Sequence, residues 1–123
     1  MIQNKLVKRY DPNIIINTNS EVFTTADSYQ QVLVMDTSQH PTYVAQIINL
    51  NTTNTLTFKI DTTFDGTNWI TQKTDTDVLP LANSFYTDSS LGTLTRISVK
   101  SKVVSTPATC TVWTRLNPAS AIL

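Results

Sequence analysis

The stretch TLTFKIDTTFDGTNWITQ, residues 55–72, decides the fold class of this chain. Its apolar side chains share one parity, and they are Leu56, Phe58, Ile60 and Phe64. Successive side chains of a strand point to opposite faces, so this pattern predicts a strand that lays one face on a core. Asp65 and Gly66 then supply the residue pair that tolerates the positive φ of a hairpin turn. The stretch therefore predicts a β-hairpin.

The position of Trp69 depends on the length of the loop in that hairpin. An even number of loop residues would place Trp69 on the same face as Phe58 and Ile60, whereas an odd number would place it outside. We expect an even loop, with Trp69 in the core. The alternative is that Trp69 lies beside the hairpin tip and stacks on a sugar. The predicted structural hairpin consists of Phe64, Asp65, Gly66 and Trp69.

The rest of the chain shows short runs of Val, Ile, Thr and aromatic residues, separated by Asn, Asp, Ser and Pro. No segment has a sustained helical stripe of apolar residues, so we expect an all-β protein. Predicted strands cover 14–18, 21–26, 29–36, 42–50, 55–64, 68–73, 94–104 and 108–116. The strand 29–36 is expected to be central because both of its faces are apolar, and 74–93 is expected to be a loop with at most one short strand.

About eight strands without a helix predict a two-sheet antiparallel β-sandwich, a jelly roll or a related Greek key. The length of 123 residues fits one domain. We expect an extended N-terminal arm over 1–12, the sandwich domain over 13–117 and a C-terminal tail over 118–123. The arm is expected to be extended because Pro12 disfavours a helix at Asp11.

The net charge is zero, but the charges are unevenly distributed. Residues 1–10 carry three bases and no acid, 11–95 carry all nine acids and two lysines, and 96–123 carry four bases. Either the basic ends dock on an acidic partner, or these are ordinary solvated charges. The predicted partner-binding residues are Ile2, Lys5, Leu6, Lys8 and Arg9 in the arm, and Arg96, Lys100 and Lys102 in the strand 94–104.

That strand alternates between apolar and basic residues. Ile97, Val99 and Val103 are expected to face the core, and the three cations are expected to line the opposite face. A row of like charges is destabilising unless an acid lies near it. We expect acidic side chains opposite the row, from a sister subunit or from the surface of a larger particle.

The residues that usually carry chemistry are scarce. A single cysteine, Cys110, cannot form an internal disulfide, and the ligands of a zinc site are not available. The only histidine, His40, is expected to be a surface residue without a role, because no acid and nucleophile are spaced for a triad. Asp75, Asp77 and Asp88 do not form a calcium loop of the EF-hand type. We expect no enzyme activity, no cofactor and no metal.

Partners of two other kinds are also not expected. The bases are not interleaved with aromatic residues as a nucleic-acid platform requires. No apolar run is long enough to span a membrane, and the start of the chain does not resemble a secretion signal. We therefore expect synthesis in a cytoplasm, with no direct nucleic-acid partner and no membrane partner.

The segment IDTTFDGTNWITQ, residues 60–72, resembles a hairpin common in small β-sandwich proteins of tailed-bacteriophage virions. That hairpin has an apolar strand, then Asp-Gly-x-x-Trp, then a Thr-rich strand, and it occurs in head decoration (cement) proteins, head fibre bases and tail components. The resemblance covers 55–73 and carries over no catalytic residue. It implies a structural protein of the virion, made in the host bacterial cytoplasm and seated on the major capsid protein or another virion protein.

Two expectations follow for assembly. The arm can reach about 33–36 Å and add a strand to an open edge of a neighbouring copy, giving a homo-oligomer with a trimer favoured. The arm could instead be a frayed end. The alternative function is a carbohydrate-binding β-sandwich module on a phage fibre or tail. Such a module needs several aromatic residues aligned on one sheet face, whereas Trp69 and Trp113 lie on different predicted strands.

Overall fold

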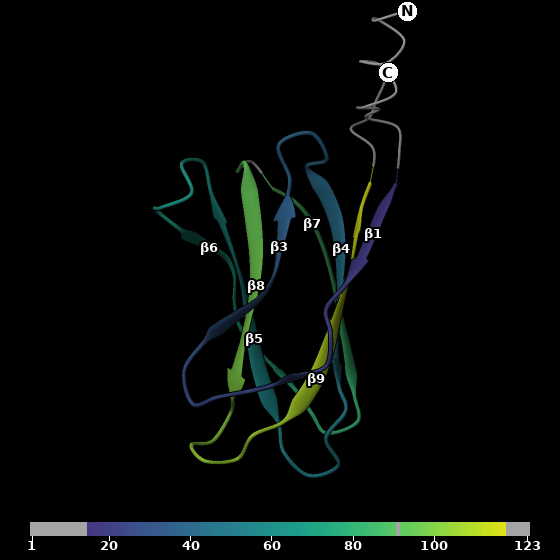
Figure 1. The fold of residues 1–123 in the computed structure, drawn as a ribbon, viewed down its shortest axis with the longest axis vertical. Helices are drawn as coiled ribbons and strands as arrows, with labels where there is room; N and C mark the ends of the chain where they lie inside the picture. The colour runs from purple at the N-terminus through teal and green to yellow at the C-terminus, as the bar shows by residue number, and fades with distance from the viewer. Residues whose placement is uncertain (1–14, 91, 118–123) are drawn as a thin grey trace, which may run out of the picture.

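The computed structural model describes residues 15–90 and 92–117, which form nine strands in two antiparallel sheets (Figure 1). Sheet A contains β1 (Ile16–Asn19), β2 (Phe23–Thr24), β4 (Thr42–Asn49), β7 (Asn83–Ser89) and β9 (Thr109–Leu116). Sheet B contains β3 (Gln30–Asp36), β5 (Leu56–Thr63), β6 (Ile70–Val78) and β8 (Leu94–Ser101). The predicted arm, 1–12, and tail, 118–123, lie outside the described residues, and so do Ile2, Lys5, Leu6, Lys8 and Arg9.

The strand order identifies the sandwich as a jelly roll. Sheet A has the order β1-β9-β4-β7, with β2 continuing the edge that β1 forms along β9, and sheet B has the order β3-β8-β5-β6. Most connections cross from one sheet to the other, and among the described strands β5 and β6 alone are joined directly as a paired hairpin. Two sheets with these strand orders, in which β1 and β2 share one edge position along β9, have the jelly-roll arrangement. The predicted all-β sandwich is confirmed.

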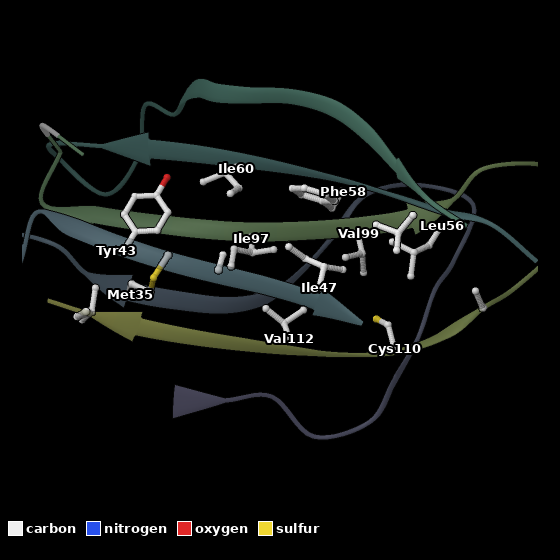
Figure 2. Close-up of a cluster of buried hydrophobic side chains, with 14 residues drawn as sticks. Met35, Tyr43, Ile47, Leu56, Phe58, Ile60, Ile97, Val99, Cys110 and Val112 are labelled. Atoms are coloured by element: carbon white, nitrogen blue, oxygen red, sulfur yellow. The ribbon is translucent and has the colours of Figure 1, made fainter. Parts of the chain in front are cut away.

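The core lies between the two sheets and comes from every second residue of their central strands (Figure 2). Its largest fully buried side chains include Tyr43, Ile47, Leu56, Phe58, Ile60, Ile97, Val99 and Val112. Full burial of a large apolar side chain contributes about 1.5–3 kcal/mol, so this layer dominates the stability of the fold. The alternation predicted for β5 is confirmed at its first three apolar positions, which are completely buried.

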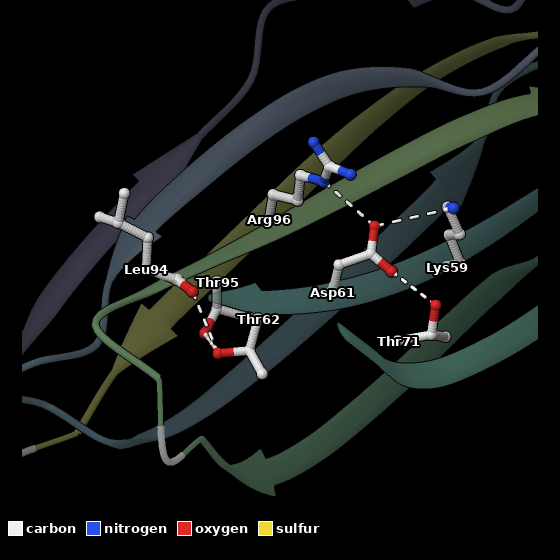
Figure 3. Close-up of polar contacts among 7 residues, drawn as sticks. All are labelled: Lys59, Asp61, Thr62, Thr71, Leu94, Thr95 and Arg96. Atoms are coloured by element: carbon white, nitrogen blue, oxygen red, sulfur yellow. Dashed lines mark hydrogen bonds and ion pairs between the residues drawn. The ribbon is translucent and has the colours of Figure 1, made fainter. Parts of the chain in front are cut away.

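Buried hydroxyls continue the core where the apolar alternation of β5 stops. Thr62, which is half-buried, follows Ile60 on the inner face, and its hydroxyl donates to the Leu94 carbonyl at 3.0 Å (Figure 3). Its Oγ1 also lies 2.7 Å from the Oγ of the buried Ser90. Thr95 Oγ1 lies 2.8 Å from Ser90 Oγ. Buried polar groups are stable only when they are hydrogen-bonded, and these hydroxyls satisfy one another. Threonine therefore fills core positions as well as surface positions in this protein.

The hairpin loop has an odd length, so the prediction that Trp69 lies in the core is wrong. Thr62 pairs with Ile70, which places Trp69 opposite Thr63 and leaves five residues, 64–68, in the loop. Trp69 is half-buried on the outer face of sheet B, and Phe64, also expected inside, is 74 % exposed. Phe64 does not face the core because β5 ends at Thr63, so the alternation of inward and outward side chains stops before Phe64.

The turn chemistry expected of Asp65 and Gly66 is present. Asp65 Oδ1 accepts the backbone N–H groups of Thr67 and Asn68, both at 2.8 Å, and Gly66 has φ +81°. Hydrogen bonds to the carboxylate, first from the Asn68 backbone and then from the Thr67 backbone, lower the pKa of Asp65. The pair closes the hairpin, but around a loop of five residues.

Several strand predictions need correction. Residues 74–93 are not mainly a loop, because β6 runs on to Val78 and β7 pairs with β4 through seven residues. The strand 29–36 is not central: β3 is an edge strand, interrupted by a register shift between Gln31 and Leu33. The strand has apolar residues on both faces because Val34 lies on its outer face, where it is 39 % exposed at the edge of the sheet.

Two single-residue predictions are also wrong. Val103 was expected in the core, but β8 ends at Ser101 and Val103 is 59 % exposed. His40 was expected on the surface without a role, but it is buried, with 5 % of its surface exposed. His40 is therefore part of the packed end of the sandwich between β3 and β4.

The close approach of Gly92 to β5 generates a stability prediction. A Cβ at this position would lie 1.9 Å from Thr62 Oγ1 and 2.8 Å from the Thr63 carbonyl oxygen. Gly92→Ala would therefore push Thr62 out of the hydroxyl cluster, and we expect it to lower the free energy of unfolding by about 3 kcal/mol. Chemical denaturation followed by circular dichroism measures this change.

The matched control is Gly66→Asn. No atom lies within 4 Å of a Cβ built at Gly66, and asparagine tolerates a positive φ. We expect this variant to unfold within about 1 kcal/mol of the parent. Equal stability of Gly92→Ala and the parent would contradict the packing described for Thr62.

Candidate functional site

The outer face of sheet B is organised around one buried carboxylate. Asp61 is 2 % exposed although it lies on the solvent side of β5. It accepts a hydrogen bond from Arg96 Nε at 3.0 Å and another from Thr71 Oγ1 at 2.9 Å, and Lys59 Nζ lies 3.8 Å away (Figure 3). A buried charge is tolerated only when it is paired and hydrogen-bonded, and both conditions are met here.

Arg96 also stacks on one face of the Trp69 ring. Its guanidinium carbon lies 4.0 Å from the centroid of the Trp69 ring, a stacking geometry that attracts a cation to the ring face. The register of β5 and β8 places Arg96 opposite Asp61, so one arginine binds the carboxylate and the indole together. The alternative of a free, sugar-stacking Trp69 is weakened, because a cation already lies on the ring.

Tyr29 is enclosed in a similar way at the other end of this face. The ammonium groups of Lys59 and Lys100 lie 4.7 Å and 5.0 Å from the centroid of its ring. Its hydroxyl donates a hydrogen bond to Asp75. Burial, and then this hydrogen bond, raise the pKa of Tyr29 well above its ordinary value. The aromatic and charged groups of the sheet B face are thus already bound to one another.

The acids expected opposite the basic row are supplied by the chain itself. Asp61 pairs with Arg96, and Asp77 Oδ2 lies 2.9 Å from Lys102 Nζ. The hydrogen bond from Lys102, followed by one from Thr57, lowers the pKa of Asp77. A sister subunit or particle is therefore not required to neutralise this row. Partner binding by Arg96, Lys100 and Lys102 stays a prediction.

The outer face of sheet A is different, because it carries exposed aromatic residues. In the strand register Gln46 of β4 lies opposite Trp113 on β9 and opposite Phe85 on β7. Trp113 is 46 % exposed and Phe85 is 67 % exposed. The two rings therefore stand on one face, on either side of β4. A carbohydrate-binding module needs aromatic residues aligned on one sheet face in this way. The alignment of Trp113 with Phe85 was not evident from the sequence.

These residues surround a shallow depression, here called the sheet A groove, of about 260 Å³. It is lined by Asn17, Val44, Gln46, Phe85, Trp113, Thr114 and Arg115. Gln46 Nε2 donates to Asn83 Oδ1 at 3.3 Å, which fixes the amide in the floor of the groove. Among the described residues that line it there is no carboxylate, and Arg115 is the single charged one.

This site was not predicted from the sequence because β7 was not predicted as a strand. Phe85 lies in a segment that was predicted to be mainly a loop, so its side of the sheet could not be assigned. The alternation of Phe85 and Thr87 on one face with Tyr86 on the other was the available signal. Tyr86 packs on the core beside Tyr43, with ring centroids 6.2 Å apart, and this contact sets the outward direction of Phe85.

Within 15–90 and 92–117 there is no group of three or more His, Cys, Asp or Glu side chains that could hold a metal ion. In the same part of the chain no helix is long and apolar enough to cross a membrane. Cys110 is completely buried, and burial raises the pKa of its thiol to about 11. The thiol is thus a core side chain.

Solved structures that are similar to this fold include PirA and a chain from a bacterial pilus. PirA, known from a crystal structure, matches with 16% identity and a TM-score of 0.60, over 76% of this chain and 90% of PirA. A chain from Bacillus endospore appendages, described as a novel family of disulfide-linked pili, matches with 11% identity and a TM-score of 0.52, over 85% of this chain and 89% of that chain. At these identities the likeness shows the fold alone. No protein-family model and no curated protein sequence matches the chain.

The ion pairs of Asp61 and Asp77 generate a second prediction. Asp61→Asn keeps the shape of the side chain but removes the charge that holds Arg96 and Lys59. We expect it to lower the free energy of unfolding by about 2 kcal/mol, since hydrogen bonds to charged groups contribute about 1.5–3 kcal/mol. Asp77→Asn is the matched control: its pair with Lys102 is exposed, and we expect a loss below about 1 kcal/mol. Similar losses in both variants would contradict the central position assigned to Asp61.

Proposed function

We propose that this protein is a non-enzymatic structural protein that assembles with copies of itself. The observation that carries the proposal is the edge position of β7, which pairs with β4 alone among the described strands. Its pairing with β4 runs through seven residues without irregularity, whereas β3 and β6 carry register shifts and the β1 edge is interrupted before β2. Strand edges that lack bulges, proline and lysine pair readily with another chain. β7, with the sequence NSFYTDS, has none of these protections.

The segment proposed to pair with this edge is the N-terminal arm of a neighbouring copy. The arm precedes β1, and β1 and β7 are opposite edges of sheet A. A contact between unlike edges is heterologous, and it closes into a ring or continues as a filament. A closed ring of three copies agrees with the trimer favoured from the sequence.

Charge supports the same pairing. The arm carries Lys5, Lys8 and Arg9 without an acid before Asp11. β7 carries Asp88, whose carboxylate accepts the Tyr86 hydroxyl at 2.6 Å. That hydrogen bond, followed by one from the Ser89 backbone, lowers the pKa of Asp88 and keeps it charged. A basic strand added beside β7 would therefore meet a fixed negative charge.

The similar chain from disulfide-linked pili gives this proposal a precedent for assembly on a related fold. Covalent linkage of that kind does not suit this protein, because its one cysteine is enclosed in the core. We therefore propose a non-covalent assembly. The specific setting that we propose is the bacteriophage virion, with the protein decorating or cementing a capsid or attached at the head or tail, in line with the hairpin resemblance at 55–73.

We also propose that the protein catalyses no reaction. Its candidate catalytic side chains have structural partners or lie in the packed interior: Asp61 is held by Arg96 and Lys59, and Cys110 is in the core. Catalysis needs a nucleophile or base that can reach a substrate.

The proposal is tested by deleting residues 2–10. We expect the truncated chain to stay folded, with an unchanged far-UV circular dichroism spectrum, because β1 begins only at Ile16. It should lose self-association and should no longer co-sediment with phage particles. Asp88→Lys in the full chain should weaken self-association in the same direction. A truncated chain that still assembles and still occupies particles fully would show that the arm is not the docking element.

A further inference from the structure

The sheet A groove combines exposed aromatic rings with polar groups that have no partner in the described chain. The Asn17 amide, the Arg115 guanidinium and the indole N–H of Trp113 make no side-chain hydrogen bond or ion pair with any residue of 15–90 and 92–117. On sheet B the comparable groups are bound internally, as Arg96 is to Asp61. The same residue types are thus engaged on one face and available on the other.

The rings are spaced for a ligand longer than one group. Trp113 and Phe85 lie two strands apart, so their backbones are separated by about 10 Å. Gln46 lies between them in the floor, and because its amide nitrogen donates to Asn83, its carbonyl oxygen is left as an acceptor. The groove therefore offers stacking surfaces at two ends and amide groups in the middle.

This chemistry selects among ligand classes. Nucleic acid is disfavoured because one arginine cannot neutralise a run of phosphates. A metal cation is disfavoured because the described residues that line the groove include no carboxylate. A purely apolar segment would cover the amide and guanidinium groups without hydrogen-bonding them, which costs free energy. A pyranose sugar has an apolar C–H face that can stack on an aromatic ring and a rim of hydroxyls that both donate and accept.

We infer that the sheet A groove is a binding site for a neutral oligosaccharide. Trp113 and Phe85 stack on sugar rings, and Gln46, Asn17 and Arg115 hydrogen-bond the hydroxyls. Small-ligand sites commonly combine apolar walls with a few placed polar groups in this way. The inference differs from the assembly proposed above, since it uses side chains on the outer face of sheet A, including Phe85 of β7, whereas the assembly uses the backbone edge of β7.

The test is a glycan array that carries neutral and acidic bacterial surface oligosaccharides, followed by titration of the best-binding neutral glycan. Isothermal titration calorimetry measures the affinity of each variant, and Trp69→Phe is the matched control because Trp69 lies on the opposite sheet. We expect saturable binding that Trp113→Ala and Phe85→Ala each weaken about tenfold or more. Both side chains are exposed, so circular dichroism should show that the variants stay folded.

Three results would overturn the inference. These are no binding to any neutral glycan on the array, unchanged affinity in Trp113→Ala, or binding confined to acidic glycans and lost in Arg115→Gln alone. Sedimentation of Trp113→Ala separates this site from the assembly surface. We expect its oligomeric state to match the parent, and a loss of self-association would show that the groove is an interface between copies instead.

Discussion

The pairing of β5 with β8 is the constraint on which the arrangement of sheet B depends. Its register places Asp61 opposite Arg96 on the outer face and Ile60 opposite Ile97 on the inner face. The inner pairs form the core, and the outer pair gives a buried carboxylate its counter-charge. Because Arg96 also stacks on Trp69, the register of these two strands fixes the hairpin that follows β5 as well. A shift of one residue would exchange the two faces and leave Asp61 in the core.

The two outer faces of the sandwich consequently differ in what they offer to a partner. On sheet B, lysines and arginine cover aromatic rings and pair with aspartates, so a ligand would have to displace interactions that already exist. On sheet A, Trp113 and Phe85 stand exposed around amide groups, and β7 is an edge strand that pairs with β4 alone among the described strands. Both proposals therefore concern sheet A, the first its edge and the second its face.

The fold class was readable from the sequence because alternation is a local property. The alternation of Leu56, Phe58 and Ile60 predicts a strand with one face on the core, and this prediction does not depend on the rest of the sequence. The loop parity was not readable, because Asp65 and Gly66 are compatible with two, four or five loop residues, and the number is fixed by the register of Thr62 with Ile70. A pair of turn residues shows where a hairpin lies. It does not determine which face of the sheet the first side chain of the next strand occupies.

The candidate site depends on tertiary contacts that the short local alternation around Phe85 does not determine by itself. The strand β7 is rich in Asn, Ser and Asp, which usually indicate a loop, and it forms because β4 pairs with it along its whole length. Only that pairing brings Phe85 to the same face as Trp113. In the same way, His40 looked like a loop residue beside Pro41 and is buried by the packing of the sandwich end.

Self-association of the full chain is the central claim, and sedimentation velocity of the purified protein measures it most directly. The run is made over a wide concentration range, with and without a reducing agent. We expect one defined oligomer, or a filament, whose size does not depend on the reducing agent, because the contact is between strands and Cys110 is buried. A monomer at every concentration, or an oligomer that the reducing agent dissolves, would contradict it.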